Sequence, residues 1–296
     1  MRPRSRMDHK KGGHTAMRRP HRRSLKQRVY RWLYRGLLSL AVGAALYVVI
    51  ADQLTAAQWG QATVRYSRAT AQMSAAAISR QRQMAVSYNA MVRRRQQGDE
   101  TARSAYRYRQ ILWLDAQGTM ATLTIPAIHL KMPIRHGTDA HTLEQGIGHW
   151  PRSSLPIGGM SNRPIITGHS GIAGQILFTN IEKLRRTDTF YIQVLNRTLK
   201  YQITKISRVR PQQITQGNIV VGQDEATLLT CWPIGINTYR LLVTGRRVPY
   251  HLRDEYQPVA VRDWWTIDHL LLLGLVLLAG VGSLRYVHKK LRGKKK

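Results

Sequence analysis

The chain has 296 residues, with 47 Lys+Arg against 15 Asp+Glu and a formal net charge of +32. Hydrophobic residues make up 43% of it, which excludes a fully disordered chain and allows one folded domain plus additional segments. The single cysteine excludes an intramolecular disulfide and a cysteine-rich zinc site. The charge predicts contact with something anionic, and nucleic acid is the first candidate.

The basic residues are concentrated at the two ends of the chain. Residues 1–35 hold 13 Lys/Arg and one acid, and residues 285–296 hold 7 Lys/Arg and no acid. Each basic block directly adjoins an apolar run, which is the arrangement that flanks membrane spans. This placement favours a membrane over nucleic acid, so no nucleic-acid partner is expected.

Two membrane spans are predicted, at residues 36–54 and 264–284. The first contains an uncharged run of 16 residues, Gly36 to Ala51, and approaches the roughly 20 residues that cross a bilayer. The second needs Trp264 and Trp265, which are typical of the interface, to become long enough. A cleaved signal peptide and a peripheral hairpin are the respective alternatives.

The positive-inside rule places both basic tails, residues 1–35 and 285–296, in the cytoplasm. The expected protein is therefore a two-pass protein of the cell membrane, with everything between the spans outside. Anionic lipid head groups then account for much of the basic excess, at about 1 kcal/mol per Lys or Arg near the surface.

The segment between the spans changes character at Gly118. Residues 55–117 contain no proline and are rich in Ala, Gln, Arg and Met, which predicts one or two helices interrupted near Gly98. Residues 118–250 carry short β-type runs separated by Gly, Pro and Asn, and residues 251–263 form a linker to the second span. Regularly spaced short strands favour a mainly β domain, either a barrel or a sandwich. The expected strands are Thr119–Ile125, Pro164–Thr167, Thr189–Leu195, Leu199–Ile206, Ala226–Cys231 and Tyr239–Arg246.

Cys231 and Arg240 form the stronger of two candidate chemical sites. One expected strand ends at Cys231, a loop with Pro, Gly and Asn follows, and the next strand begins near Arg240. If the strands are neighbours, the guanidinium approaches the sulfur, where it can favour a thiolate and stabilise an oxyanion. The alternative is a buried cysteine at a strand end beside a surface arginine.

His169 is the second candidate, because an expected strand runs into a histidine placed between Gly168 and Gly171. The glycines leave the imidazole uncrowded, as a general acid or base requires. Cys231 with His169 is a nucleophile and base hypothesis, although such a pair alone is weakly specific. No His, Cys and Asp residues have metal-ligand spacing, so no metal or cofactor is expected.

These motifs together resemble those of class C, pilin-type sortases. The matching residues are Thr227-Leu-Leu-Thr-Cys231, then Pro-x-Gly-x-Asn-Thr-x-Arg240, with Thr-Gly-His169 and Ile125-Pro126 upstream. The resemblance covers about residues 119–247. It implies a closed eight-stranded β-barrel preceded by helices, and a second span is also typical of that class.

The resemblance further implies a role for each candidate residue. Cys231 would attack the Thr–Gly bond of an LPXTG-like sorting signal and form a thioacyl enzyme. His169 would protonate the leaving amine and then deprotonate the incoming one, and Arg240 would hold the signal and stabilise the oxyanion. The expected partners are LPXTG-bearing surface proteins or pilins and an amine acceptor, which in this class is typically a pilin lysine.

The sequence departs from the class pattern in three places. No Asp-Pro-aromatic lid motif is present, because residues 52–118 contain no proline. Either the enzyme lacks a lid or an unrelated segment between Arg93 and Trp113 replaces it. Tyr239 and Ser170 stand where the class usually has a histidine and a basic residue, which could shift substrate preference.

Two other functions remain open. A housekeeping-type sortase would attach surface proteins to a cell-wall precursor instead of polymerising pilins. A non-enzymatic membrane receptor or scaffold would bind wall polyanions or DNA through its basic surface, and salt-dependent DNA binding without thiol chemistry would distinguish it.

Overall fold

The computed structural model describes residues 25–171 and 177–251, together with Gly274, Gly280 and Gly282. The chain divides into two compact units, residues 1–44 with 276–296 and residues 45–275, and every strand among the described residues belongs to the second unit. Over the described part of the chain, no helix has a stretch that is both long and apolar enough to cross a membrane.

The expected span at residues 36–54 is therefore not confirmed, although these residues are helical. The expected span at 264–284 lies outside the described residues except for its three described glycines. The C-terminal basic tail and residues 1–24 also lie outside them, whereas residues 25–35 belong to the first helix.

Two helices precede the β domain, α1 (Leu25–Ala71) and α2 (Ala75–Gln96). Ser74 separates them, and its side chain accepts a hydrogen bond from the Ala77 N–H as an N-cap. The helical interpretation of residues 55–117 was right up to the interruption near Gly98 and wrong beyond it. Residues 97–117 contain only the 3₁₀ turn η1 (Tyr108–Gln110).

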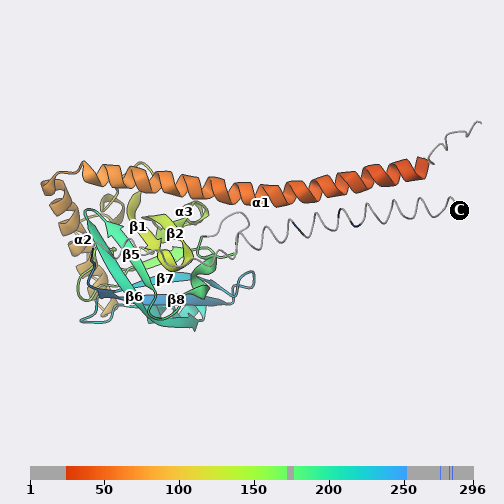
Figure 1. Cartoon of the computed structure of the whole chain (residues 1–296). Coiled ribbons are helices and arrows are strands. Elements are labelled where there is room, and N and C mark those ends of the chain that lie inside the picture. The colour runs from red at the N-terminus through yellow and green to blue at the C-terminus, as the bar shows by residue number, and fades with distance from the viewer. Residues whose placement is uncertain (1–24, 172–176, 252–273, 275–279, 281, 283–296) are drawn as a thin grey trace, which may run out of the picture. The chain divides into compact units, whose positions relative to one another are not determined.

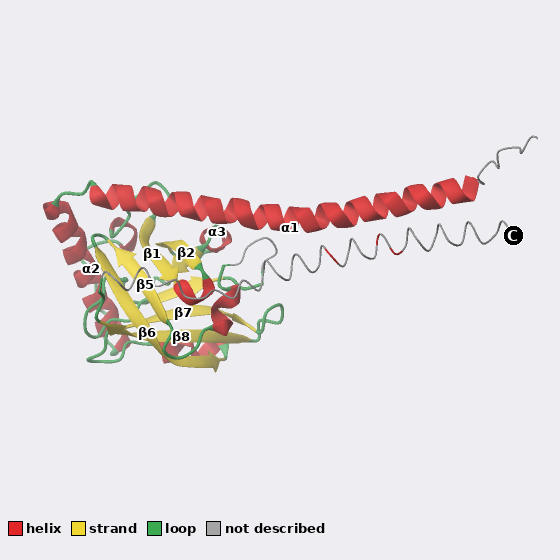
Figure 2. Ribbon diagram, in the orientation of Figure 1, coloured by secondary structure: helices red, strands yellow, loops and turns green. Residues whose placement is uncertain are grey.

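Eight strands form a closed barrel, in the order β1-β2-β3-β4-β7-β8-β6-β5. Figures 1 and 2 show the sheet and label six of its strands. This confirms the barrel alternative over the sandwich. The strands are β1 (Thr119–Ile125), β2 (Leu130–His136), β3 (Ile147–His149), β4 (Ile165–Gly168), β5 (Thr189–Val194), β6 (Arg197–Val209), β7 (Glu225–Trp232) and β8 (Tyr239–Val248). The shorter helical elements are η2 (Pro126–Ile128), α3 (Ala140–Glu144), η3 (Thr179–Lys183) and η4 (Pro211–Gly217).

Six of these strands are the predicted ones, and β2 and β3 were missed. Pro133 lies in β2, and proline argues against a strand because it cannot donate to the ladder. In the structure β2 pairs with β3 only from Ile134 onward, so Pro133 interrupts no bond on that side. The three residues of β3 are too few to show an alternating pattern, so local sequence could not reveal it.

The barrel interior is filled by apolar side chains, and α1 is fastened to it through Tyr66. This tyrosine is fully buried; its hydroxyl donates to Met120 O at 3.0 Å and accepts from the Leu195 N–H at 2.9 Å. Both partners belong to the β domain, so the C-terminal part of α1 is an integral part of this fold.

A second apolar cluster lies on the other face of β4, β7 and β8. Ile165, Leu229 and Leu242, one from each strand, pack with Val209 of β6 and are flanked by Trp150 and Ile214. Ile214 belongs to η4, in the β6–β7 connection. One face of this sheet region therefore points into the barrel core, and the opposite face carries its own smaller apolar cluster.

His149 is completely buried in a fixed tautomer. Its Nε2 lies 2.7 Å from Ser154 O, which only accepts, so Nε2 donates and Nδ1 accepts from the Tyr108 hydroxyl at 2.9 Å. The neutral ring is thus satisfied at both nitrogens. Burial lowers the pKa of His149 to about 3.

We expect the free energy of unfolding to decrease as the pH falls below about 6.5. In this range the unfolded chain binds a proton at His149 and the folded chain does not. The free energy of unfolding should therefore fall by about 2 kcal/mol between pH 7 and pH 5. Burial lowers the pKa of His136 as well, with the same sign. Denaturant unfolding at several pH values measures this slope. His149→Gln should flatten it, whereas the exposed His141→Gln should not; an unchanged slope in the first variant would contradict the assignment.

Candidate functional site

The strand register brings Cys231 and Arg240 together. In the antiparallel pair of β7 and β8, these two residues are direct Cα partners. The parallel pair of β4 and β7 aligns Thr167 with Leu229, so the same register carried two residues further brings His169 level with Cys231. All three predicted residues therefore meet at one end of three neighbouring strands.

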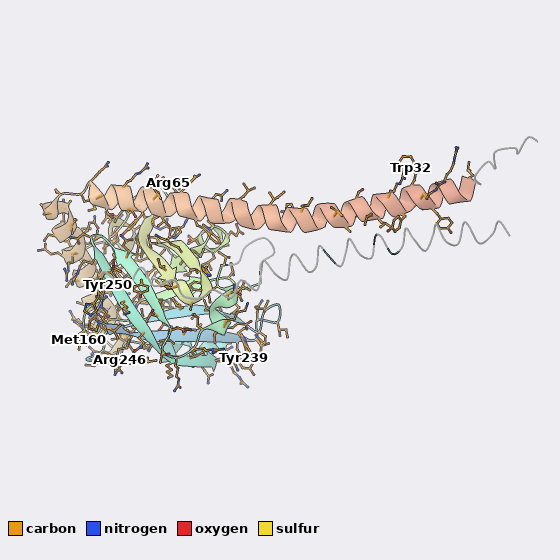
Figure 3. All side chains as sticks on the ribbon, in the orientation of Figure 1. Trp32, Arg65, Met160, Tyr239, Arg246 and Tyr250 are labelled. Atoms are coloured by element: carbon orange, nitrogen blue, oxygen red, sulfur yellow. The ribbon has the colours of Figure 1, made fainter. Side chains whose placement is uncertain are left out.

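Strand alternation gives these positions one common face. Cys231 lies two residues after Leu229 and Arg240 two residues before Leu242, so both share the face of the outer apolar cluster. Cys231 is a free thiol, and all three candidate side chains are partly exposed. Figure 3 shows Tyr239, the neighbour of Arg240, and Arg246 at opposite ends of the barrel. The site thus occupies the Tyr239 end, on the outside of the sheet.

Two side-chain hydrogen bonds hold β4 and β7 together where the strands end. Ser170 Oγ donates to Cys231 O at 2.7 Å, and Thr230 Oγ1 donates to Gly168 O at 2.7 Å. Each bond crosses from one strand to the other, so the backbones on either side of His169 and Cys231 are linked in both directions. Sequence reasoning noted Ser170 only as a departure from the class, and its contact with Cys231 was not foreseen.

Gly168 and Gly171 allow neighbouring segments to approach His169 closely. A Cβ on Gly168 would lie 2.8 Å from Ile147 Cγ2 and 2.9 Å from Phe178 Cγ. A Cβ on Gly171, whose φ is +73°, would lie only 2.4 Å from Ile234 Cγ2 in the loop after Cys231. Side chains of other segments therefore occupy the space beside both glycines, and Gly171 also adopts a left-handed backbone conformation.

Arg240 is oriented by the loop that joins β7 to β8. Its Nη1 donates to Asn237 O and Tyr239 O, both at 3.0 Å. A guanidinium has five N–H donors in a rigid fork, so this bonding leaves others for a ligand. The same side chain thereby holds the loop and presents a fixed positive charge opposite Cys231.

Trp232, the residue after Cys231, lies on the opposite face and has its own set of partners. Its indole N–H donates to Glu182 Oε2 at 3.1 Å, and the Arg208 guanidinium carbon lies 4.2 Å from its ring centroid. The Tyr239 ring is 6.1 Å away, and the Trp232–Pro233 peptide bond is cis. Sequence reasoning did not select Trp232 or Glu182, and their contact joins segments 50 residues apart.

The segment where a lid would occur packs elsewhere. Tyr108 contacts His149, Trp113 lies 5.1 Å from the His136 ring, and the Leu112 N–H donates to Gln81 of α2. Among the described residues, none of the hydrogen bonds or ring contacts of residues 97–117 reaches Cys231. The described chain also contains no group of three or more metal-ligating side chains.

Comparison with protein families matches residues 123–248 to the sortase domain. That range begins in β1 and ends with β8, so it contains His169, Cys231 and Arg240.

Solved structures of sortase C enzymes are similar to the chain. The pilus-related sortase C of Group B Streptococcus is 37% identical, with a TM-score of 0.57, over 64% of this chain and 97% of that one. Sortase C-1 from Actinomyces oris is 38% identical, with a TM-score of 0.52, over 58% and 98%. Among curated proteins, sortase D of Bacillus subtilis (strain 168) is 28% identical over 43% of this chain. The match spans 62% of that relative, less than two thirds of its length.

Proposed function

Because this chain belongs to the sortase family, and within it to class C, we propose that it is a cysteine transpeptidase acting on LPXTG-like sorting signals. The observation that carries the proposal is the register of β4, β7 and β8, which aligns His169, Cys231 and Arg240 at one strand end. A nucleophile, a proton carrier and an oxyanion donor are the three groups that acyl transfer through sulfur requires.

The first half of the reaction forms the thioacyl enzyme. The Cys231 thiolate attacks the threonine carbonyl carbon of the signal, and Arg240 donates to the oxygen as negative charge develops on it. The C–N bond then breaks, His169 gives its proton to the departing glycine amine, and a thioester remains on Cys231. The guanidinium suits this role because the loop carbonyls of Asn237 and Tyr239 already fix its orientation.

The second half transfers the acyl group to an amine. The amine attacks the thioester carbon, His169 takes up the proton that the nitrogen loses, and the C–S bond breaks to restore Cys231. Two acyl transfers through sulfur replace a direct attack of an amine on an amide, which is slow.

The acceptor we propose is a lysine of a pilin subunit, so that the product is an isopeptide-linked polymer. Support comes from the similar solved structures, one of which is described as a pilus-related sortase C. The housekeeping alternative has support of its own, because sortase A of Bacillus anthracis is 25% identical over 45% of this chain.

We place the enzyme in the cell membrane, with the barrel on the outside and both basic tails in the cytoplasm. The apolar runs within residues 36–54 and 264–284, each next to a basic block, support this placement.

A ligation assay tests the function directly. The protein is incubated with a labelled LPXTG peptide and either a lysine-containing pilin peptide or a wall-precursor peptide with a free amine, and the products are identified by mass spectrometry. We expect cleavage after threonine and an isopeptide bond to the pilin lysine. Ligation only to the wall-precursor amine would favour the housekeeping function, and no cleavage of any LPXTG variant would refute the transpeptidase.

A further inference from the structure

A carboxylate is held beside the nucleophile on the side of the sheet that faces away from the thiol. Glu182, in η3, accepts the Trp232 indole N–H through Oε2, and Trp232 directly follows Cys231 in the chain. The side chain is exposed, so its other oxygen is open to a ligand. No described ion pair involves Glu182, in a chain whose formal charge is +32.

The element that carries Glu182 is also fixed to the His169 side of the site. The Phe178 N–H, just before η3, donates to His169 O at 3.0 Å. Thr179 is the first residue of η3, and its Oγ1 accepts a hydrogen bond from the Gly171 N–H at 3.0 Å. Glu182 is therefore connected on one side to the residue after Cys231 and on the other to the backbone of His169.

Exposed apolar side chains contact two residues that η3 bonds, Gly171 and Trp232. Ile234 contacts Gly171, which bonds to η3, and Tyr239 lies against Trp232. Ile234 and Ile236 are 39% and 71% exposed although both are large hydrophobic residues. An apolar rim beside a fixed negative charge fits a cation on an aliphatic stem, because the stem packs on the rim while the head reaches the carboxylate.

The second half of the proposed reaction needs such a ligand. A lysine acceptor arrives mainly as an ammonium ion, while Arg240 and Arg208 give the site a positive field that repels it. The acceptor must also reach the thioester while the sorting signal occupies the thiol face.

We propose that Glu182, with Trp232 and the adjoining Ile234 and Tyr239, forms a binding subsite for the ammonium of a lysine acceptor. The inference rests on the transpeptidase function proposed above. Glu182 binds the acceptor and does not remove its proton, because a carboxylate beside an ammonium stabilises the charged form. To react, the lysine leaves the carboxylate and passes the strand end to the thioester. One of its protons then passes to solvent, and a second passes to His169 as the C–N bond forms and the C–S bond breaks.

Glu182→Gln tests the subsite, because the amide keeps a hydrogen-bond acceptor for Trp232 and removes only the charge. With the wild-type and variant proteins, the rate of ligation is measured against the concentration of a lysine-containing peptide. We expect the KM for this acceptor to rise about fivefold, as for loss of an exposed ion pair, with little change in kcat. High salt should raise the KM of the wild-type enzyme, because it screens the attraction between Glu182 and the ammonium, and should not raise that of the variant.

Hydroxylamine, which is uncharged at neutral pH, serves as the second acceptor. Its KM should be the same in the wild-type and Glu182→Gln proteins, since it has no charge for the carboxylate to bind. Glu144→Gln is the matched control, because it changes another exposed glutamate, on α3, and should alter neither KM.

The possible results separate the subsite from a structural role and from the parent proposal. An equal change for both acceptors would show that Glu182 only supports Trp232, and an unchanged KM for lysine would also overturn the subsite. If the wild-type protein forms no thioester and releases no product with either acceptor, the transpeptidase itself is refuted.

Discussion

Replacing Cys231 by alanine should abolish cleavage of an LPXTG-type peptide, with a loss of more than about 10⁴-fold in rate. The proposed mechanism has no other nucleophile, because the thioester forms on this sulfur and the chain contains no second cysteine. Mass spectrometry of the intact protein after brief exposure to substrate should show an acyl adduct on the wild-type protein and none on the variant.

The fold should survive this change. Cys231 is only partly buried and is the next-to-last residue of β7. Loss of its thiol therefore leaves no cavity in the barrel core. The melting temperature and circular dichroism spectrum of Cys231→Ala should match those of the wild-type protein. Because the thiol is unique in the sequence, a thiol-specific reagent should inactivate the wild-type protein with one label per chain. Wild-type activity in Cys231→Ala would refute the mechanism.

Arg240→Lys should lower kcat by about 10²-fold. Loss of one oxyanion donor in other acyl-transfer enzymes costs on the order of 10²–10³ in kcat. A lysine ammonium is a point charge that cannot both bond the carbonyls of Asn237 and Tyr239 and reach the oxyanion, whereas the guanidinium fork can. Steady-state kinetics with a fluorogenic sorting-signal peptide give the comparison.

A matched control exists on the same strand. Arg246 lies at the opposite end of β8, where its Nη2 donates to Gln223 Oε1, and Arg246→Lys should keep normal kinetics (Figure 3). Both variants should melt near the wild-type temperature. Near-normal rates in Arg240→Lys would mean that this arginine only holds the β7–β8 loop.

The sequence predicted those parts of the fold that local patterns encode. The runs that became β1, β5, β6, β7 and β8 are rich in β-branched and aromatic residues, and the structure reproduces each within three residues at either end. Strand β2 was not predicted because it contains Pro133. A proline is compatible with this strand only because β3 does not pair with β2 at that residue, and this depends on the tertiary structure. The turn between α1 and α2 was missed because it contains neither glycine nor proline, only the N-cap Ser74.

The candidate site was predictable to the same extent. His169, Cys231 and Arg240 could be selected because each lies at the junction of a strand with a turn rich in Gly or Pro, and together they match a family motif. The hydrogen bonds from Ser170 to Cys231 and from Trp232 to Glu182 join segments 61 and 50 residues apart, so no local sequence pattern predicts them. Such contacts follow only from strand order.

The segment at residues 97–117 illustrates the same limit. Composition without proline predicted helix, yet Tyr108 and Trp113 are used to cover His149 and His136 at the edge of β2 and β3. These contacts are made with residues of β2 and β3, two strands that the sequence did not predict, so the contacts could not be predicted either.

The parallel pairing of β4 with β7 has a consequence for how the protein becomes active. β5 and β6 lie between these two strands in the sequence, and the paired residues are about 60 positions apart, so the pairing is among the most non-local contacts of the barrel. Neither half of the domain contains a reactive centre by itself. Thiol, imidazole and guanidinium come into register only as the barrel closes, so a partly folded chain lacks the assembled site.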